Sequence, residues 1–279
     1  MALRDYSRCF HSQFRNPLVR MFHSSISGVI AVAGIVLASA GCDNRQTTQS
    51  DVASAVVDSS TTGSITGTVT LQGSLPASKP IDMSASPACV QANATTVASQ
   101  QAVTGEDGQL ANVVVYLKKG LAKHQFKTPS EPAVLVQKNC MYAPHVVALM
   151  TNQPFEVAND DPTMHNVHPL PKNNRQWSTS QPAGSTALKS SFARPEFAMP
   201  MLCSVHPWMR AFVFVFDNPY FAVTSKTGRF ELRNVPSGTY TVEAWQEYFG
   251  TQDRTVTVGP KELKTVSFIF ANGRDHHAE

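Results

Sequence analysis

Two short stretches in the second half of the chain carry residues with metal-binding side chains. The stretch CSVHPWM, residues 203–209, carries Cys203, His206 and Met209, and the stretch MHNVHP, residues 164–169, begins with Met164 and His165. A Cys at the end of a strand, followed by a tight loop with His and Met, brings a thiolate, an imidazole and a thioether into one small volume. His165 adds a second imidazole. These residues predict a site with two imidazoles, one thiolate and one weak sulfur ligand.

The donor types favour one metal over others. Two imidazoles with soft sulfur ligands suit copper that cycles between two oxidation states. Zinc prefers a fourth strong ligand to a thioether, and a binuclear copper centre needs a second bridging Cys beside the first. A catalytic Cys–His pair leaves the Met without a role. We therefore expect one copper ion at this site.

The remaining histidines are weaker ligand candidates. His168 is expected to line the mouth of the site, and His145 is expected to be an ordinary strand residue. His276 and His277 lie in the tail GRDHHAE, where adventitious metal is the alternative. A His in a strand protein is ordinarily a satisfied polar residue and a Met is ordinarily core.

The loop that carries Cys203, His206 and Met209 resembles a loop of a known protein family. CSVHPWMRAFVFVF resembles the ligand loop of the cupredoxins, the blue-copper electron carriers, and its Cys-x2-His-x2-Met spacing is most similar to that of amicyanin. The resemblance covers roughly residues 133–217, although RPEFAMPML before the Cys lacks the usual Gly-Tyr turn. It implies a type 1 copper centre with His165, Cys203, His206 and Met209 as ligands and His168 outside the set.

The resemblance also implies roles for neighbouring residues. The backbone N–H of Asn166 is expected to donate to the thiolate, and its side chain to tie the two ligand loops together; an ordinary turn Asn is the alternative. An exposed edge of His206 is expected, inside an apolar patch where a redox partner docks briefly. That patch consists of Pro207, Trp208, Pro169 and Leu170, with Phe155 as a further candidate. The alternative is that Trp208 packs inward.

A second resemblance covers the last part of the chain. FAVTSKTGRFELRNVPSGTYTVEAW is similar to the carboxypeptidase regulatory-like domain, a prealbumin-like sandwich, through its T-x3-G-x-F and NVPSG signatures. GSITGTVTLQGSLP and LANVVVYLKKG look like the first strands of that domain. The resemblance therefore implies that a cupredoxin, residues 128–218, is inserted into a sandwich formed by residues 63–127 and 219–271. A simple tandem is the alternative.

Strand signals dominate the whole chain. Alternating or β-branched runs such as SITGTVTL, NVVVYLK, AVLVQ and RAFVFVFD are separated by turn signals, and no window shows a sustained helical period. We expect an all-β protein made of two sandwiches.

The first residues predict export. Residues 1–41 contain four Arg, one Asp and the apolar run ISGVIAVAGIVLASA, a pattern typical of a signal sequence. SAG before Cys42 resembles a bacterial lipobox, which predicts lipidation of Cys42; plain cleavage or an uncleaved anchor are the alternatives. Residues 42–62 read as a flexible tether and residues 272–279 as a tail. No basic patch with interleaved aromatics supports nucleic-acid binding.

Cys89 and Cys140 remain after the lipid and copper sites are assigned. An oxidising compartment favours a bridge between them, so we expect a disulfide.

Taken together, these patterns predict a periplasmic, membrane-anchored electron carrier that is not an enzyme and that meets redox partner proteins near His206. A non-redox binding module, such as a carbohydrate-binding-like scaffold, and a copper storage or delivery protein are the rivals.

Overall fold

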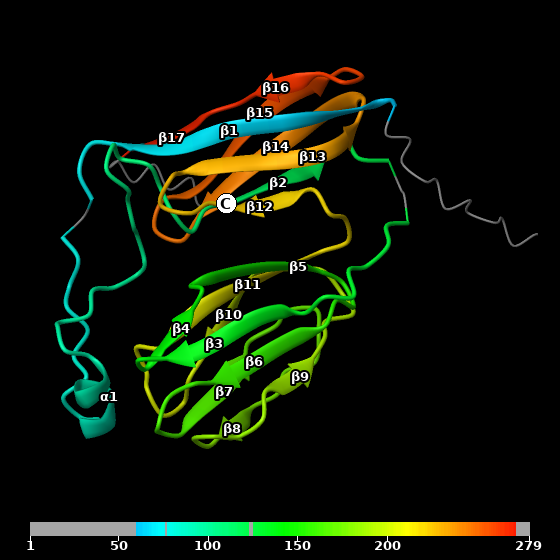
Figure 1. The fold of residues 1–279 in the computed structure, drawn as a ribbon. Helices are drawn as coiled ribbons and strands as arrows, with labels where there is room; N and C mark the ends of the chain where they lie inside the picture. Colours follow the sequence, from blue (N-terminus) through cyan, green and yellow to red (C-terminus); the bar gives the residue numbers. More distant parts are fainter. Residues whose placement is uncertain (1–59, 76, 123–124, 272–279) are drawn as a thin grey trace, which may run out of the picture. The chain divides into compact units, whose positions relative to one another are not determined.

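The computed structural model describes residues 60–75, 77–122 and 125–271, which belong to one compact unit (Figure 1). The expected export signal, Cys42, most of the tether and the tail with His276 and His277 lie outside the described residues. In the described part of the chain, no helix is long and apolar enough to cross a bilayer. Strands dominate, as the sequence predicts.

The first sandwich, here the host sandwich, takes its strands from both ends of the described chain (Figure 1). One sheet has the order β13-β1-β16, with β17 also paired to β1, and the other has the order β12-β2-β14-β15. The strands are β1 (Thr62–Gln72), β2 (Val114–Lys119), β12 (Phe221–Val223), β13 (Arg229–Pro236), β14 (Gly238–Gln246), β15 (Gly250–Val258), β16 (Leu263–Thr265) and β17 (Phe268–Ala271).

Strand pairing in the host sandwich joins segments far apart in sequence. Tyr116 of β2 lies opposite Phe221 of β12, and Val115 lies opposite Ala244 of β14. This pairing is the one that an inserted domain requires and a tandem does not. β1 begins at Thr62, so the last residue assigned to the tether is already in a strand.

Period-2 alternation and two glycines explain how β1 packs. Ile65, Val69 and Leu71 point into the host core, with intermediate residues between them. A Cβ at Gly67 would lie 1.6 Å from the carbonyl oxygen of Val266, so this close approach requires glycine. Gly228 has φ +63° in the turn before β13, as the hairpin signature predicts.

The second sandwich, here the inserted sandwich, is continuous in sequence. Its sheets have the orders β5-β11-β10-β7-β8 and β4-β3-β6-β9. The strands are β3 (Ala133–Lys138), β4 (Met141–Ala143), β5 (Val146–Met150), β6 (Phe155–Asn159), β7 (His165–Pro169), β8 (Thr179–Gln181), β9 (Leu188–Ser190), β10 (Glu196–Leu202) and β11 (Arg210–Phe216).

One segment assigned to the host by sequence packs on the inserted sandwich instead. The connection between β1 and β2 contains the short helix α1 (Pro87–Ala92), and Met83 and Cys89 are part of the inserted sandwich's core. Ile81 and Val97 pack against the same core. The boundary at residue 127 is therefore wrong for this stretch: its apolar side chains are buried against the other sandwich, and a disulfide holds it there. We call residues 81–97 the cap segment.

A separate apolar cluster joins the two sandwiches. Val114, Tyr116 and Trp245 of the host pack with the phenylalanines of β11, and the rings of Phe214 and Trp245 have centroids 4.9 Å apart. Ring pairs of this kind contribute about 0.5–1.5 kcal/mol beyond the burial of their area. The cluster gives the described part of the chain an aromatic contact between the host and the insertion.

Candidate metal centre

Two neighbouring strands bring the predicted ligands to one end of the inserted sandwich. His165 is the first residue of β7, and Cys203 directly follows β10. These strands are antiparallel, with Leu202 opposite His168, so the start of β7 and the end of β10 lie together. His206 and Met209 follow in the loop that leads to β11.

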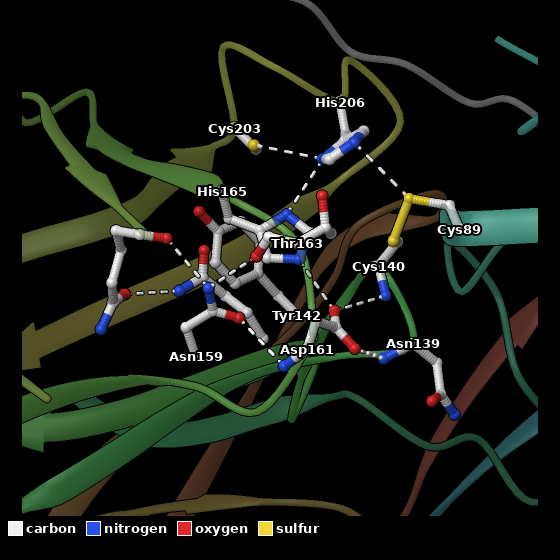
Figure 2. Close-up of polar contacts among 12 residues, drawn as sticks. Cys89, Asn139, Cys140, Tyr142, Asn159, Asp161, Thr163, His165, Cys203 and His206 are labelled. Atoms are coloured by element: carbon white, nitrogen blue, oxygen red, sulfur yellow. Dashed lines mark hydrogen bonds and ion pairs between the residues drawn. A yellow bond between two sulfur atoms is a disulfide. The ribbon is translucent and has the colours of Figure 1, made fainter. Parts of the chain in front are cut away.

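The predicted ligand atoms converge (Figure 2). Nδ1 of His165 lies 2.9 Å from Nδ1 of His206, and Sγ of Cys203 lies 3.9 Å from the same nitrogen. All three side chains are buried, and their ligand atoms lie within 4.8 Å of one another. Met209 is fully buried in the adjoining core and donates its N–H to the carbonyl of His206 over 2.9 Å. Ligation by its thioether stays a prediction.

Asn166 makes both kinds of contact expected of it. Its backbone N–H donates to Sγ of Cys203 over 3.3 Å, and its Oδ1 accepts from the hydroxyl of Ser204 over 2.9 Å. The side-chain amide also donates to the hydroxyl of Ser178 over 3.1 Å. Asn166 therefore links the two ligand loops and supports the thiolate.

Charge is distributed unevenly over the three converging groups. Burial lowers the pKa of His165, but hydrogen bonds to Cys203 and Asp161 and their negative charges outweigh it, and the pKa is raised. Burial raises the pKa of Cys203, yet the hydrogen bonds from His165 and from backbone N–H groups such as that of Asn166 lower it overall. The pKa of His206 is lowered by burial and by repulsion from His165. The protein thus stabilises a thiolate at this point, as a soft metal ligand requires.

The far edges of both imidazoles are occupied by the protein. Nε2 of His165 lies 2.8 Å from Oδ2 of Asp161. Nε2 of His206 lies 3.2 Å from Oγ of Ser86 and 3.5 Å from Sγ of Cys89. Each Nε2 has a protein contact, and the two Nδ1 atoms face each other beside the thiol. The donor set therefore fits one metal ion held through both Nδ1 atoms.

Cys89 and Cys140 form the predicted disulfide, with Cα atoms 5.5 Å apart. Both residues are fully buried. The bridge attaches the cap segment to the turn between β3 and β4, directly beside His206 (Figure 2).

The prediction of an exposed docking patch around His206 is wrong, because most of its residues are buried or half-buried. His206 is only 3% exposed because the cap segment covers its ring, and Pro169 is buried in β7. Trp208 is half-buried against the core and donates its indole N–H to the carbonyl of Cys140 over 3.0 Å, which is the inward alternative. Leu170 is half-buried and Phe155 lies fully in the core; Pro207 is exposed.

The other described histidines make different contacts. Nε2 of His168 lies 2.7 Å from the side-chain amide nitrogen of Gln176. His145 is buried, with Nε2 2.7 Å from a carboxylate oxygen of Glu247. Neither residue is part of the cluster of converging ligand atoms.

Two residues at the site escaped the sequence analysis. Asp161 lies four residues before His165, in the turn after β6, and this short spacing was an available signal. Ser86 lies 120 residues before His206, and no local pattern points to their contact.

Comparisons with known proteins give a partial and low-identity likeness. A model of the family described as polysaccharide lyase family 4, domain II, matches residues 200–266, which include parts of both sandwiches. No curated protein matches the chain.

Solved structures with a partial likeness to this chain include copper proteins. A Cu-containing nitrite reductase from Thermus scotoductus SA-01 is 17% identical with a TM-score of 0.30; the match covers 36% of this chain and 26% of the reductase chain. A purple cupredoxin from Nitrosopumilus maritimus is 19% identical with a TM-score of 0.26, covering 30% of this chain and 98% of the other. A reduced amicyanin variant is 15% identical with a TM-score of 0.28, covering 36% and 97%. The chemistry of the site must therefore be argued from its own side chains.

Proposed function

We propose that this protein is an exported blue-copper protein that carries single electrons and is not itself an enzyme. One type 1 copper ion would be held by His165, Cys203, His206 and Met209. The signal-like residues 1–41 and the lipobox-like Cys42 support a periplasmic location with a lipid anchor in the membrane. The host sandwich serves as a scaffold for the inserted sandwich.

One observation carries the proposal. Two imidazole Nδ1 atoms and a thiolate sulfur, from two separate loops, meet in a buried space, and a backbone N–H from Asn166 supports the sulfur. Bound copper supplies a one-electron couple between Cu(II) and Cu(I). The surrounding chain excludes water from the three side chains and fixes their orientation through β7 and β10.

Burial of the donors argues against the delivery alternative. Cys203 and His206 are each 3% exposed and His165 is 0% exposed. A protein that hands copper to a partner must expose its donors to ligand exchange. Here the cap segment and the core cover them, which supports retention of the metal during electron transfer.

The test is a copper titration of the purified protein, followed by visible absorption. We expect one equivalent of copper and an intense band from thiolate-to-copper charge transfer. Cys203→Ser should abolish the band, whereas His168→Ala, a change in β7 that lies outside the cluster, should retain it. A band that persists in Cys203→Ser would sink the proposal, as would a wild-type protein that binds no copper.

A further inference from the structure

Asp161 is a buried carboxylate that uses both of its oxygens at the metal site (Figure 2). Oδ2 lies 2.8 Å from Nε2 of His165 and also accepts the backbone N–H of Cys140 over 2.8 Å. Oδ1 accepts the backbone N–H of Asn139 over 2.6 Å. A buried carboxylate without hydrogen-bond partners would destabilise the fold. These three contacts offset that cost and hold the Asp161 side chain in one orientation.

The chain fixes this carboxylate from two sides. Asn159 accepts the N–H of Asp161 over 3.0 Å and donates to the carbonyl of Thr163 over 2.9 Å, which holds the turn between β6 and β7 in shape. Asn139 and Cys140 form the tight turn between β3 and β4, with φ values of 54° and 55°. The left-handed conformation is unusual for Cys. It turns both N–H groups toward Asp161.

The position of Asp161 decides which nitrogen of His165 is available. A carboxylate beside Nε2 keeps a proton on that nitrogen, so Nδ1 is the atom that can offer a lone pair to a metal ion. The negative charge also favours the more highly charged state of a metal bound to the ring. Among the described residues, no carboxylate lies within hydrogen-bond distance of Nε2 of His206, which faces the neutral Ser86 and the disulfide.

We propose that Asp161 is a positioning residue that fixes the Nε2–H tautomer of His165, strengthens Cu(II) binding and lowers the reduction potential of the centre. This inference rests on the proposed function, because it concerns the same copper site. Asp161 acts through the imidazole and does not itself contact the metal.

The experiment compares three variants with the copper-loaded wild type. In Asp161→Asn, the dissociation constant for Cu(II) should rise about 10–100-fold, with a smaller change for Cu(I), so that the reduction potential rises. Asp161→Glu retains the charge and should stay closer to the wild-type potential. Asp160→Asn removes the same charge from the exposed neighbouring residue and is the matched control.

If Asp161 has only a structural role, Asp161→Asn should be less stable than the wild type but should have the same reduction potential as Asp160→Asn. This result would overturn the proposal. If Asp161→Asn does not fold, nitrogen-15 NMR of histidine-labelled, copper-free wild type, at a pH where the His165 ring is neutral, decides instead, because copper at Nδ1 would itself force the proton onto Nε2. A slowly exchanging proton on Nε2 of His165 is expected, and a proton on Nδ1 would refute the inference. Failure of the wild type to bind copper with a thiolate band would refute the proposed function, a distinguishable outcome.

Discussion

The hydroxyl of Ser86 lies 3.2 Å from Nε2 of His206, on the ring edge that the sequence predicted to face solvent. Ser86 immediately precedes α1, and Cys89 of that helix lies 3.5 Å from the same nitrogen. The cap segment therefore covers this edge of His206. In the function proposed above, an electron that leaves through this imidazole would have to pass through the cap segment, or the segment would have to move.

Ser86→Ala tests the contribution of this contact to metal retention. The change removes one hydrogen bond to His206, which contributes about 0.5–1.5 kcal/mol, so copper should bind roughly twofold to tenfold more weakly. Competition with a chelator of known affinity measures the effect. Ser84→Ala alters an exposed hydroxyl in the same segment and should leave the affinity unchanged. Equal copper affinities in Ser86→Ala and Ser84→Ala would show that the contact between Ser86 and His206 does not contribute to copper binding.

The double substitution Cys89→Ala with Cys140→Ala tests the attachment of the cap segment. The bridge spans a sequence separation of 51, and its loss should lower the free energy of unfolding by roughly 2–4 kcal/mol. Chemical denaturation measures this loss. The His206 ring should also become accessible, which acylation by diethyl pyrocarbonate followed by peptide mass spectrometry detects in the copper-free protein. Unchanged protection of His206 would mean that packing alone holds the cap segment in place.

Asn166→Ala tests the link between the two ligand loops. The backbone N–H that donates to Cys203 is retained, so the visible band should persist. Loss of the side-chain contacts with Ser204 and Ser178 should accelerate copper release to a chelator. Ser178→Ala removes one of these contacts and should have the smaller effect; a larger effect of Ser178→Ala would contradict the assigned role of Asn166.

Glu196 gives a prediction for the pH dependence of stability. It is buried at the start of β10, and its carboxylate accepts N–H groups from Lys172, Asn173 and Asn174. Burial raises its pKa, but the hydrogen bonds from the Asn174 side chain and these backbone groups outweigh it, and the pKa is lowered below 4.5. Because the folded pKa is the lower one, the stabilisation is present above the unfolded value and is lost as the pH falls through the folded pKa.

Glu196→Gln should therefore be less stable than the wild type by roughly 1–3 kcal/mol at pH 7. The difference should shrink once the pH falls below about 4.5, as measured by urea denaturation at several pH values. Glu156→Gln, which alters a partly exposed carboxylate paired with the exposed Lys189, should cost about 1 kcal/mol or less. A Glu196→Gln deficit that does not depend on pH would contradict the ionised role.

Chemistry that lies close together in sequence could be predicted from the residues. Cys203, His206 and Met209 fall within seven positions, and their donor types limit the metals that can bind. The strands followed from period-2 alternation, since one face of each sheet must be buried. Cys89 and Cys140 were found by elimination among five Cys, and the structure joins them.

The environment of these residues was decided by tertiary structure. Whether the edge of His206 faces solvent depends on a segment about 120 residues away, and the burial of Pro169 depends on its place in β7 beside β10. The carboxylate of Asp161 is held beside His165 because the turn at Asn139 and Cys140 lies against the turn before β7 and donates two N–H groups to it. Such contacts arise from strand pairing and packing between distant parts of the chain, which the spacing of residues along the sequence does not specify.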